Sequence, residues 1–235
     1  YDIGCALSGG LDSRLLYSLL NIHKGSSIHS YSFGTENSLD LKISSAISEY
    51  YQGCNKRVII DEDNWLHNRE LYISETDGMF DMQHMHCAII NGSNLNFEAN
   101  YSGFMGDAVF GGSYLKRNEL DLYWHDLKHD KVLTAAHQIS DQLKEYTYFP
   151  SCDPVKILNR GRRFLNYGNK ILSEETVQLF PFMDTELIEL IYQLPDRERF
   201  NNKFYEKFLQ KHFKEPFDKF PWSKTNRCLL YTSDA

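Results

Sequence analysis

The sequence predicts an α/β fold in which a parallel sheet is followed by a helical lobe. Three observations lead to this prediction. Apolar strand segments alternate with helical patterns in the first half, a glycine-rich turn joins the first strand to the first helix, and helical patterns dominate from Tyr114 onward. Alternating strand and helix patterns are typical of parallel βα units. We place a boundary near Ser113, with 1–113 as the α/β layer, 114–226 as the helical lobe and 227–235 as a tail.

The predicted strands share short apolar runs bounded by turn residues, and they cover 2–7, 28–33, 57–60 and 98–102. The first helix follows the turn at Ser8–Asp12 and places leucines at helical spacing through Leu20. Ser38 or Asp40 can cap a second helix that runs to about Tyr51. Further helical stretches are expected over 63–74 and 82–90, and in the lobe over 204–213.

The composition indicates a packed globular chain with an acidic charge. Hydrophobic residues make up 42% of 235 residues, which is enough for one sizeable core with a small lobe. A formal net charge of -7 provides no domain-wide basic field, so nucleic acid is not expected as the main partner.

The five cysteines are widely spaced, and no Cys-x-x-Cys pair occurs. This pattern argues against a disulfide framework or a cysteine zinc site, and it favours reduced thiols in the cytoplasm. We find no signal peptide and no apolar run of transmembrane length, so a membrane location is not expected. The chain starts directly in a strand-like segment, which suggests that an N-terminal part precedes it.

The segment Ser8-Gly9-Gly10-Leu11-Asp12-Ser13 is the strongest functional signal. Glycines let the backbone approach a ligand closely, and the N–H groups at a helix start attract anions. The pattern lacks both the Gly-Lys-Ser/Thr of the Walker loop and the Gly-x-Gly-x-x-Gly of dinucleotide folds. In its place between strand and helix, the hexapeptide favours phosphate binding over an ordinary capped Gly-Gly turn.

Asp12 is an acid within this phosphate loop. At contact distance and intermediate dielectric, a bare carboxylate beside a polyphosphate would be repelled by about 4 kcal/mol per charge. A bridging Mg²⁺ removes this conflict, since carboxylate and phosphate oxygens are its usual ligands. The loop therefore predicts a site for magnesium and a polyphosphate.

The same hexapeptide resembles the pyrophosphate loop of the N-type ATP pyrophosphatases. Within that superfamily the chain looks like the synthetase domain of asparagine synthetase and β-lactam synthetase, from Ile3 to about Asn226. The matching segments follow in the expected order: Ser32-Phe33-Gly34, Asp40-Leu41-Lys42, the glycine-rich loop 102–112, Pro181-Phe182-Met183-Asp184 and Lys203. The resemblance implies an adenine-nucleotide α-hydrolase-like (PP-loop) fold with a C-terminal helical lobe.

The resemblance also implies an activity and its residues. ATP would activate a small-molecule carboxylate as an acyl-adenylate with release of pyrophosphate, and ammonia or an amine would then displace AMP. Asp12 and Asp107 would be the catalytic magnesium ligands, and Lys203 would be a catalytic lysine that stabilises negative charge. The pyrophosphate would lie on Ser8, Gly9, Gly10, Leu11, Asp12 and Ser13. Adenosine would lie on Leu7, Ser32, Phe33, Gly34, Ser102 and Gly103.

Three positions depart from the family pattern. Phe104 and Ala108 stand where the family usually carries glutamates, and Leu179 stands where it carries an arginine. These changes keep both magnesium aspartates but remove polar groups near the acceptor site. The departures suggest a relative that acts on a carboxylate other than aspartate.

The nitrogen source and the assembly stay open at this stage. In the family an N-terminal glutaminase domain supplies ammonia, so such a domain is expected either before this chain or as a separate partner; an amine within the substrate is the alternative. A homodimer is also compatible with the sequence.

Residues 227–235 look like translated adapter sequence or a truncation scar, and we leave them out of the functional reasoning.

Two other functions compete with a ligase. The first is another ATP pyrophosphatase, such as a tRNA-thiolating or an NAD- or GMP-forming enzyme. The second is a nucleotide-binding module without turnover, which the loss of polar groups at Phe104, Ala108 and Leu179 would suit.

The pair His125 and His129 has helical spacing but no third metal ligand in a known pattern, so we interpret it as part of a solvated helix face.

Overall fold

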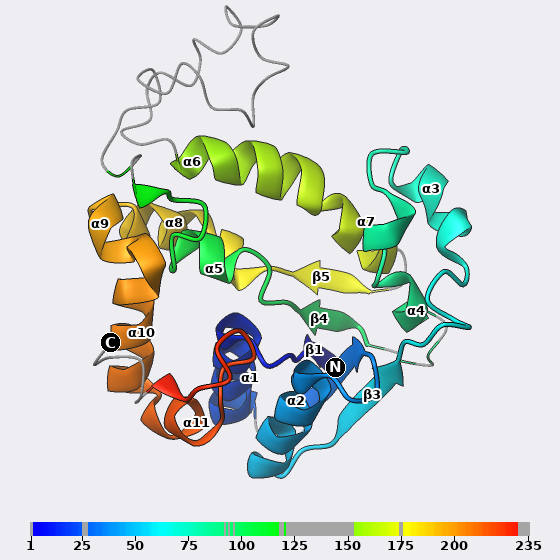
Figure 1. Cartoon of the computed structure of the whole chain (residues 1–235), viewed down its shortest axis with the longest axis horizontal. Coiled ribbons are helices and arrows are strands. Elements are labelled where there is room, and N and C mark those ends of the chain that lie inside the picture. The colour runs from blue at the N-terminus through cyan, green and yellow to red at the C-terminus, as the bar shows by residue number, and fades with distance from the viewer. Residues whose placement is uncertain are drawn as a thin grey trace, which may run out of the picture.

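The computed structural model describes residues 2–24, 28–91, 93, 95, 97–117, 120, 153–173 and 176–229. Its centre is a five-stranded, all-parallel sheet in the order β3-β2-β1-β4-β5 (Figure 1). The predicted α/β class is confirmed, with a parallel sheet, flanking helices and a helical C-terminal region. The pair His125 and His129 lies outside the described residues.

The strands are β1 (Ile3–Ala6), β2 (Ile28–Gly34), β3 (Asn55–Ile59), β4 (Ala99–Tyr101) and β5 (Val177–Leu179). β1 is central, and its Cys5 pairs with Ser30 of β2 on one side and with Tyr101 of β4 on the other. A central parallel strand is buried on both faces, which explains the apolar run at the start of the chain. Because all strands are parallel, their carboxyl ends meet at one edge of the sheet.

The longer helices are α1 (Leu11–Lys24), α2 (Leu39–Tyr50), α7 (Tyr167–Ser173), α8 (Thr185–Ile191), α10 (Lys203–His212) and α11 (Lys214–Lys219). The single-turn helices are α3 (Tyr72–Glu75), α4 (Ala88–Asn91), α5 (Gly106–Val109), α6 (Asp153–Lys156) and α9 (Asp196–Arg199). A π-helical stretch, Ile157–Leu165, continues from α6. Short 3₁₀ turns cover Arg69–Leu71, Met82–His84, Pro181–Met183 and Phe200–Asn202.

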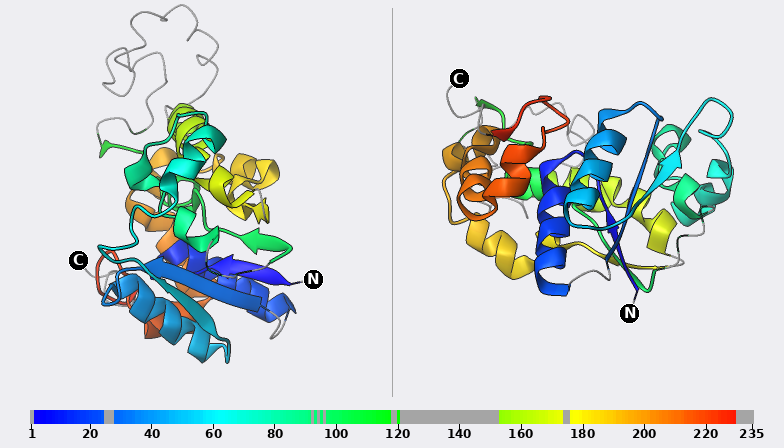
Figure 2. Two further views of the ribbon diagram at one scale, coloured as in Figure 1. Left: turned by 90° about the vertical axis from the view of Figure 1, so that its right-hand side faces the viewer. Right: turned by 90° about the horizontal axis from the view of Figure 1, so that it is seen from below.

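These helices cover the sheet on both faces (Figures 1 and 2). α1 and α2 pack under β1 and β2 and bury a cluster that includes Ile3, Cys5 and Leu7. α4 and α7 lie on the other face, where Tyr31, Ile90 and Leu172 pack together. Beyond the carboxyl edge, α5, α8 and α10 form a third cluster around Phe110 and Tyr205. None of the helices in the described residues is long and apolar enough to cross a membrane.

The helical stretch predicted over 63–74 is wrong. Turns occupy this segment up to Asn68, which adopts a left-handed conformation with φ of 59°, and only short helical turns follow. The carboxylate of Asp61 accepts hydrogen bonds from the backbone N–H groups of Asp63 and Asn64. Such local side-chain bonds compete with helix formation, so the four consecutive polar residues 61–64 favour a turn.

The helix predicted over 82–90 is also wrong, since two short turns replace it. The buried guanidinium of Arg69 donates hydrogen bonds to the carbonyls of Met82 (2.6 Å) and Gln83 (3.0 Å). These carbonyls would otherwise accept the N–H groups four residues later. A tertiary contact therefore takes the acceptors that a continuous helix needs.

The second half of the chain also contributes to the sheet. β5 comes from the region predicted as a helical lobe, and it pairs with β4 so that Tyr101 lies opposite Leu179. The boundary near Ser113 stays a prediction. In the predicted tail, Arg227 pairs with Trp222 and Leu229 is buried in the third cluster, whereas 230–235 lie outside the described residues.

Candidate active site

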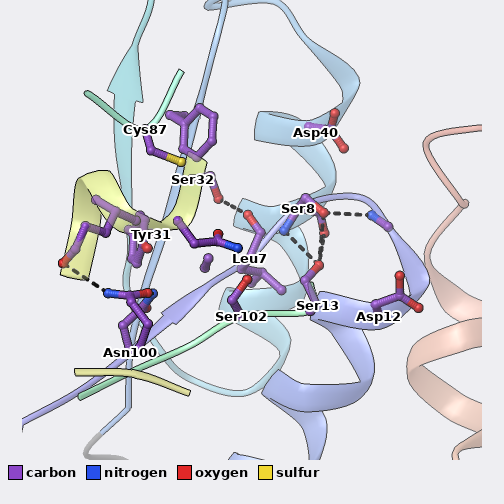
Figure 3. A pocket seen from close by; sticks show the side chains of 17 residues that line it. Leu7, Ser8, Asp12, Ser13, Tyr31, Ser32, Asp40, Cys87, Asn100 and Ser102 are labelled. Carbon is purple, nitrogen blue, oxygen red and sulfur yellow. Dashed lines mark hydrogen bonds between the residues drawn. The ribbon is translucent and has the colours of Figure 1, made fainter. Parts of the chain in front are cut away.

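A cavity of about 370 Å³ opens at the carboxyl edge of the sheet, between β1, β2 and β4 (Figure 3). Its walls include most of the residues predicted for adenosine, namely Leu7, Ser32, Phe33, Ser102 and Gly103. Gly34 is not among the described lining residues. Tyr31, Cys87, Asn100, Asn169, Leu172 and Gln178 complete this end of the cavity. The space is largely apolar with a few polar groups, as expected of a ligand pocket.

The predicted phosphate loop forms the other end of the cavity. Ser8, Gly10, Asp12 and Ser13 line it, whereas Leu11, the first residue of α1, is buried in the core. The Oγ of Ser13 accepts the Ser8 N–H (3.0 Å), and the Oγ of Ser8 accepts the Gly10 N–H (3.1 Å). The two hydroxyls are 2.9 Å apart. These bonds fix the turn in front of α1, whose first N–H groups have no partner within the helix.

Asp40 joins the loop from the first turn of α2. Its Oδ1 accepts the Gly9 N–H at 2.9 Å, and Asp40 lines the cavity. The helix cap is Ser38, whose side chain accepts the Leu41 N–H, so the carboxylate of Asp40 is available for the loop. A second acid therefore lies beside the predicted phosphate position.

Asp12 and Asp107 come together although 95 residues separate them. The Oδ2 of Asp12 accepts the backbone N–H of Asp107 at 3.0 Å, at the start of α5. Burial, followed by repulsion from the charge of Asp107, raises the pKa of Asp12 to about 7. In Figure 3, Asp12 lies on the side opposite Ser32 and points away from it.

This pair has the properties of a cation site. The Oδ1 of Asp12 is buried and has no hydrogen-bond partner among the described residues. The fully buried hydroxyl of Tyr205 lies near the same carboxylate and weakens the rise in pKa, but it makes no regular hydrogen bond there. Within the described residues, no group of three or more His, Cys, Asp or Glu is placed to hold a metal ion. Mg²⁺ often binds through one or two carboxylates together with substrate phosphates, and two carboxylates suit that mode.

Two glycines of the second loop allow this approach. A β-carbon at Gly106 would lie 2.5 Å from the Cγ of Asp12, and one at Gly103 would lie 2.8 Å from the Ser13 nitrogen. Real β-carbons do not approach other atoms so closely, so only glycine fits at either position. The glycine-rich composition of residues 103–112 therefore has a steric cause at the site itself.

The phosphate loop is tied to the end of the chain by Arg14. This fully buried guanidinium donates to four backbone carbonyls, those of Gly9, Pro216, Phe220 and Pro221, at 2.7–3.3 Å. The Ser223 N–H donates to the same Gly9 carbonyl at 3.1 Å. Burial lowers the pKa of Arg14 to about 10, so the side chain keeps its charge at neutral pH. We call these contacts of Arg14 the arginine clamp.

Lys203 lies at the start of α10, two residues before Tyr205. Its ammonium donates to the Oε1 of Glu198 at 3.0 Å, and both side chains are about half exposed. Lys203 thus lies on the same helix as Tyr205 and forms an ion pair with Glu198. Its catalytic role stays a prediction.

Sequence reasoning missed Arg14, Asp40 and Tyr205 as parts of the site. Arg14 had a signal, because it lies one turn after the turn residue Gly10 and shares a helix face with Leu11 and Ser18. An arginine on a buried helix face needs partners. Asp40 lies in the segment Asp40-Leu41-Lys42 that resembles the family, but that resemblance did not mark it as a site residue. Tyr205 had no local signal, since its neighbours at the site come from distant segments.

The fold and the loop define a class of nucleotide-binding α/β proteins in which a glycine-rich turn after the first strand precedes a helix. A family model described as asparagine synthase matches residues 1–166, more than half of the chain. The chain therefore belongs to the asparagine synthase family, and its general function is that of an ATP-using ligase. No protein in the curated collection matches the chain. The matched range contains both glycine-rich loops, whereas Pro181–Asp184 and Lys203 lie beyond it.

Proposed function

We propose that the protein is an ATP-dependent carbon–nitrogen ligase that adenylates a carboxylate, releases pyrophosphate and passes the acyl group to ammonia or an amine. The observation that carries this proposal is the meeting of Asp12 and Asp107 at the start of α1 and α5. Asp12 keeps one buried oxygen without a described partner. Family membership supports the use of ATP.

Mg²⁺ would be held by Asp12 and Asp107, with phosphate oxygens and water completing its shell. When bound, it would neutralise negative charge on the phosphates and on the leaving pyrophosphate. Deprotonation of Asp12 is coupled to such binding, because a cation favours the charged carboxylate.

The residues of the chain would bind and orient ATP. Adenosine would occupy the cavity bounded by Leu7, Ser32 and Phe33, with the β- and γ-phosphates over the loop Ser8–Ser13. The hydroxyls of Ser8 and Ser13 and the positive end of α1 would donate to the phosphate oxygens. An in-line carboxylate would then attack the α-phosphorus, giving an acyl-adenylate and pyrophosphate, and an amine would displace AMP. Positioning and charge stabilisation account for most catalysis in such transfers.

Lys203 would stabilise negative charge at the α-phosphorus. Its present ion pair with Glu198 is half exposed, and such pairs contribute about 0–1 kcal/mol. The lysine could therefore turn toward a bound nucleotide at small cost.

The first test is product analysis. We expect ATP, Mg²⁺, an acceptor acid and hydroxylamine to yield AMP and pyrophosphate, measured by ³¹P NMR, because attack at the α-phosphorus leaves the β–γ bond intact. Formation of ADP and phosphate would contradict the proposal. A reaction without Mg²⁺ serves as the control.

Replacing Gly106 by alanine tests the carboxylate pair. The new β-carbon would displace Asp12, so ATP–pyrophosphate exchange should fall at least about 100-fold, since small misplacements at a reacting centre have effects of that size. Gly78→Ala is the control, because its β-carbon would meet nothing within 4 Å and its cost is only the strain of a φ of +65°. Equal exchange in Gly106→Ala and wild type would remove the carboxylate pair from the mechanism.

A nucleotide-binding homologue without turnover is the second candidate. Ala108 is fully buried, and Phe104 packs on Phe180, so the two loop positions where the family usually carries glutamates are apolar here. Exchange of labelled pyrophosphate into ATP separates the two functions, because binding alone incorporates no label.

A further inference from the structure

A second, larger cavity lies next to the candidate active site. Its volume is about 660 Å³, within the range of about 300–1,000 Å³ that is typical of small-molecule sites. Apolar side chains form most of its wall, among them Phe104, Ile157, Leu158, Phe180, Met183 and Ile188. They come from the second glycine-rich loop, the segment 154–158 and the segment 180–192, which contains α8.

Polar groups are confined to the mouth of this cavity. The polar lining residues are Arg162, Asn166, Thr185 and Glu189, and all except the half-buried Asn166 are exposed. The apolar lining residues are partly or fully buried. An apolar group in the interior would therefore make dispersion contacts and lose its contact with water. A charged group there would find no buried polar partner among the described lining residues.

The loop 102–106 separates this cavity from the carboxylate pair. Gly103 and Gly106 contact Asp12 and the start of α1 on one side of the loop. Phe104, between them, lines the cavity on the other side, and its ring is 5.4 Å from that of Phe180. The Ser102 N–H donates to the Leu179 carbonyl at 3.0 Å, which fixes the loop against β5. A molecule in the cavity thus needs to pass only this loop to reach a nucleotide at Asp12.

The lining selects against small, doubly charged acids. Aspartate would bring a second carboxylate and an ammonium into an apolar space, and burying an unpaired polar or charged group is strongly unfavourable. An acid with an apolar body would instead gain binding free energy in proportion to the apolar surface that it removes from water. The shape and chemistry of the cavity favour the second kind of ligand.

We propose that the acceptor is a monocarboxylic acid with a bulky apolar body, which this cavity encloses while the carboxylate lies at the loop 102–106. This inference rests on the proposed function, and it names the substrate class of the same site. Phe104 is then a specificity-determining residue, because it belongs to the loop 102–106 and its ring would contact the apolar body of the acid.

Two readouts test the inference. Saturation-transfer NMR measures binding of 3-phenylpropanoate, octanoate, acetate and aspartate, and ATP–pyrophosphate exchange measures their activation. We expect 3-phenylpropanoate or octanoate to bind and to support exchange at least about tenfold better than aspartate or acetate, as differences in apolar contact allow.

Three substitutions on α8 provide matched variants. Ile188→Trp fills the cavity, and Thr185→Trp obstructs its mouth from an exposed position that folding tolerates more readily. Leu190→Trp is the control, since Leu190 is 59% exposed and is not among the described lining residues. Binding and kcat/KM for the apolar acids should fall at least about tenfold in the first two variants and stay unchanged in the control.

The outcomes separate the two proposals. Exchange with aspartate but not with the apolar acids would overturn the substrate class and leave the ligase function standing. Binding of apolar acids that Thr185→Trp weakens, without exchange for any acid, would support the cavity and overturn the ligase function. Failure of every apolar acid to bind, or binding that both tryptophan variants leave intact, would overturn the cavity assignment.

Discussion

Replacing Asp12 by asparagine is expected to stabilise the metal-free protein and to abolish ATP–pyrophosphate exchange. The carboxylate is partly buried beside the charge of Asp107, which raises its pKa to about 7. Asparagine keeps an oxygen for the Asp107 N–H and removes the like-charge repulsion. We expect a gain of about 1–2 kcal/mol at pH 8, equivalent to roughly 2–8 °C in Tm, and a loss of exchange of about 10³-fold.

The gain should depend on pH in a defined direction. The pKa of Asp12 in the folded protein is about 7, compared with an ordinary value of 3.8, so the folded state binds the proton more tightly than the unfolded state does. Ionisation of Asp12 therefore costs stability progressively as pH rises from about 4 to about 7, and the full cost remains above that range. The stability difference between Asp12→Asn and wild type should grow over the same interval.

Thermal unfolding in EDTA at several pH values measures this difference. Asp63→Asn is the control, because its side chain is exposed on a turn. A destabilised Asp12→Asn protein would show that the carboxylate is satisfied without a cation. Retained exchange would exclude Asp12 as a magnesium ligand.

Replacing Arg14 by methionine is expected to cause the largest loss of stability. Methionine fills much of the space but cannot donate to the four backbone carbonyls, of which only that of Gly9 keeps a second recorded donor, and it removes the guanidinium that lies over the ring of Phe217. Loss of one member of a buried charged network typically costs about 3–5 kcal/mol. Exchange activity should fall with stability, because Gly9 belongs to the phosphate loop.

Urea unfolding of Arg14→Met compared with Arg57→Met measures the effect. Arg57 is exposed on β3, so its replacement should change the free energy of unfolding by less than about 0.5 kcal/mol. A change in Arg14→Met as small as that of the control would show that the arginine clamp contributes nothing to the fold.

The parts of the fold with local signals were predictable from the sequence. The strand, turn and helix from Ile3 to Lys24 combine an apolar run, a glycine pair and helical periodicity in consecutive residues. The loop 102–112 likewise carries its glycines next to Asp107. In both cases neighbouring residues determine the backbone.

The missed features depend on contacts between distant segments. β5 has three residues, and nothing in Val177–Leu179 shows that β4 lies beside it. Arg69 interrupts a helix through the carbonyls of Met82 and Gln83, which neither local pattern reveals. Helix propensity is overridden wherever such tertiary bonds take the backbone groups.

The candidate site was predictable to a similar extent. Asp12 and Asp107 were expected together, and the structure joins them by a hydrogen bond. The acid Asp40 and the hydroxyl of Tyr205 reach the same region from α2 and α10, and their positions depend on how these helices pack. The ion pair of Lys203 with Glu198 was likewise not predictable from the local sequence pattern.

The arginine clamp has a consequence for the order of events during synthesis. Its carbonyl partners at Pro216, Phe220 and Pro221 lie 202–207 residues after Arg14. At about 5–20 residues per second, a ribosome needs roughly 10–40 s between the two segments. Throughout that interval the nascent chain holds a guanidinium for which only the Gly9 carbonyl, of its four acceptors, has been translated. We therefore expect the phosphate loop to reach its final conformation only after residues 216–221 have been translated.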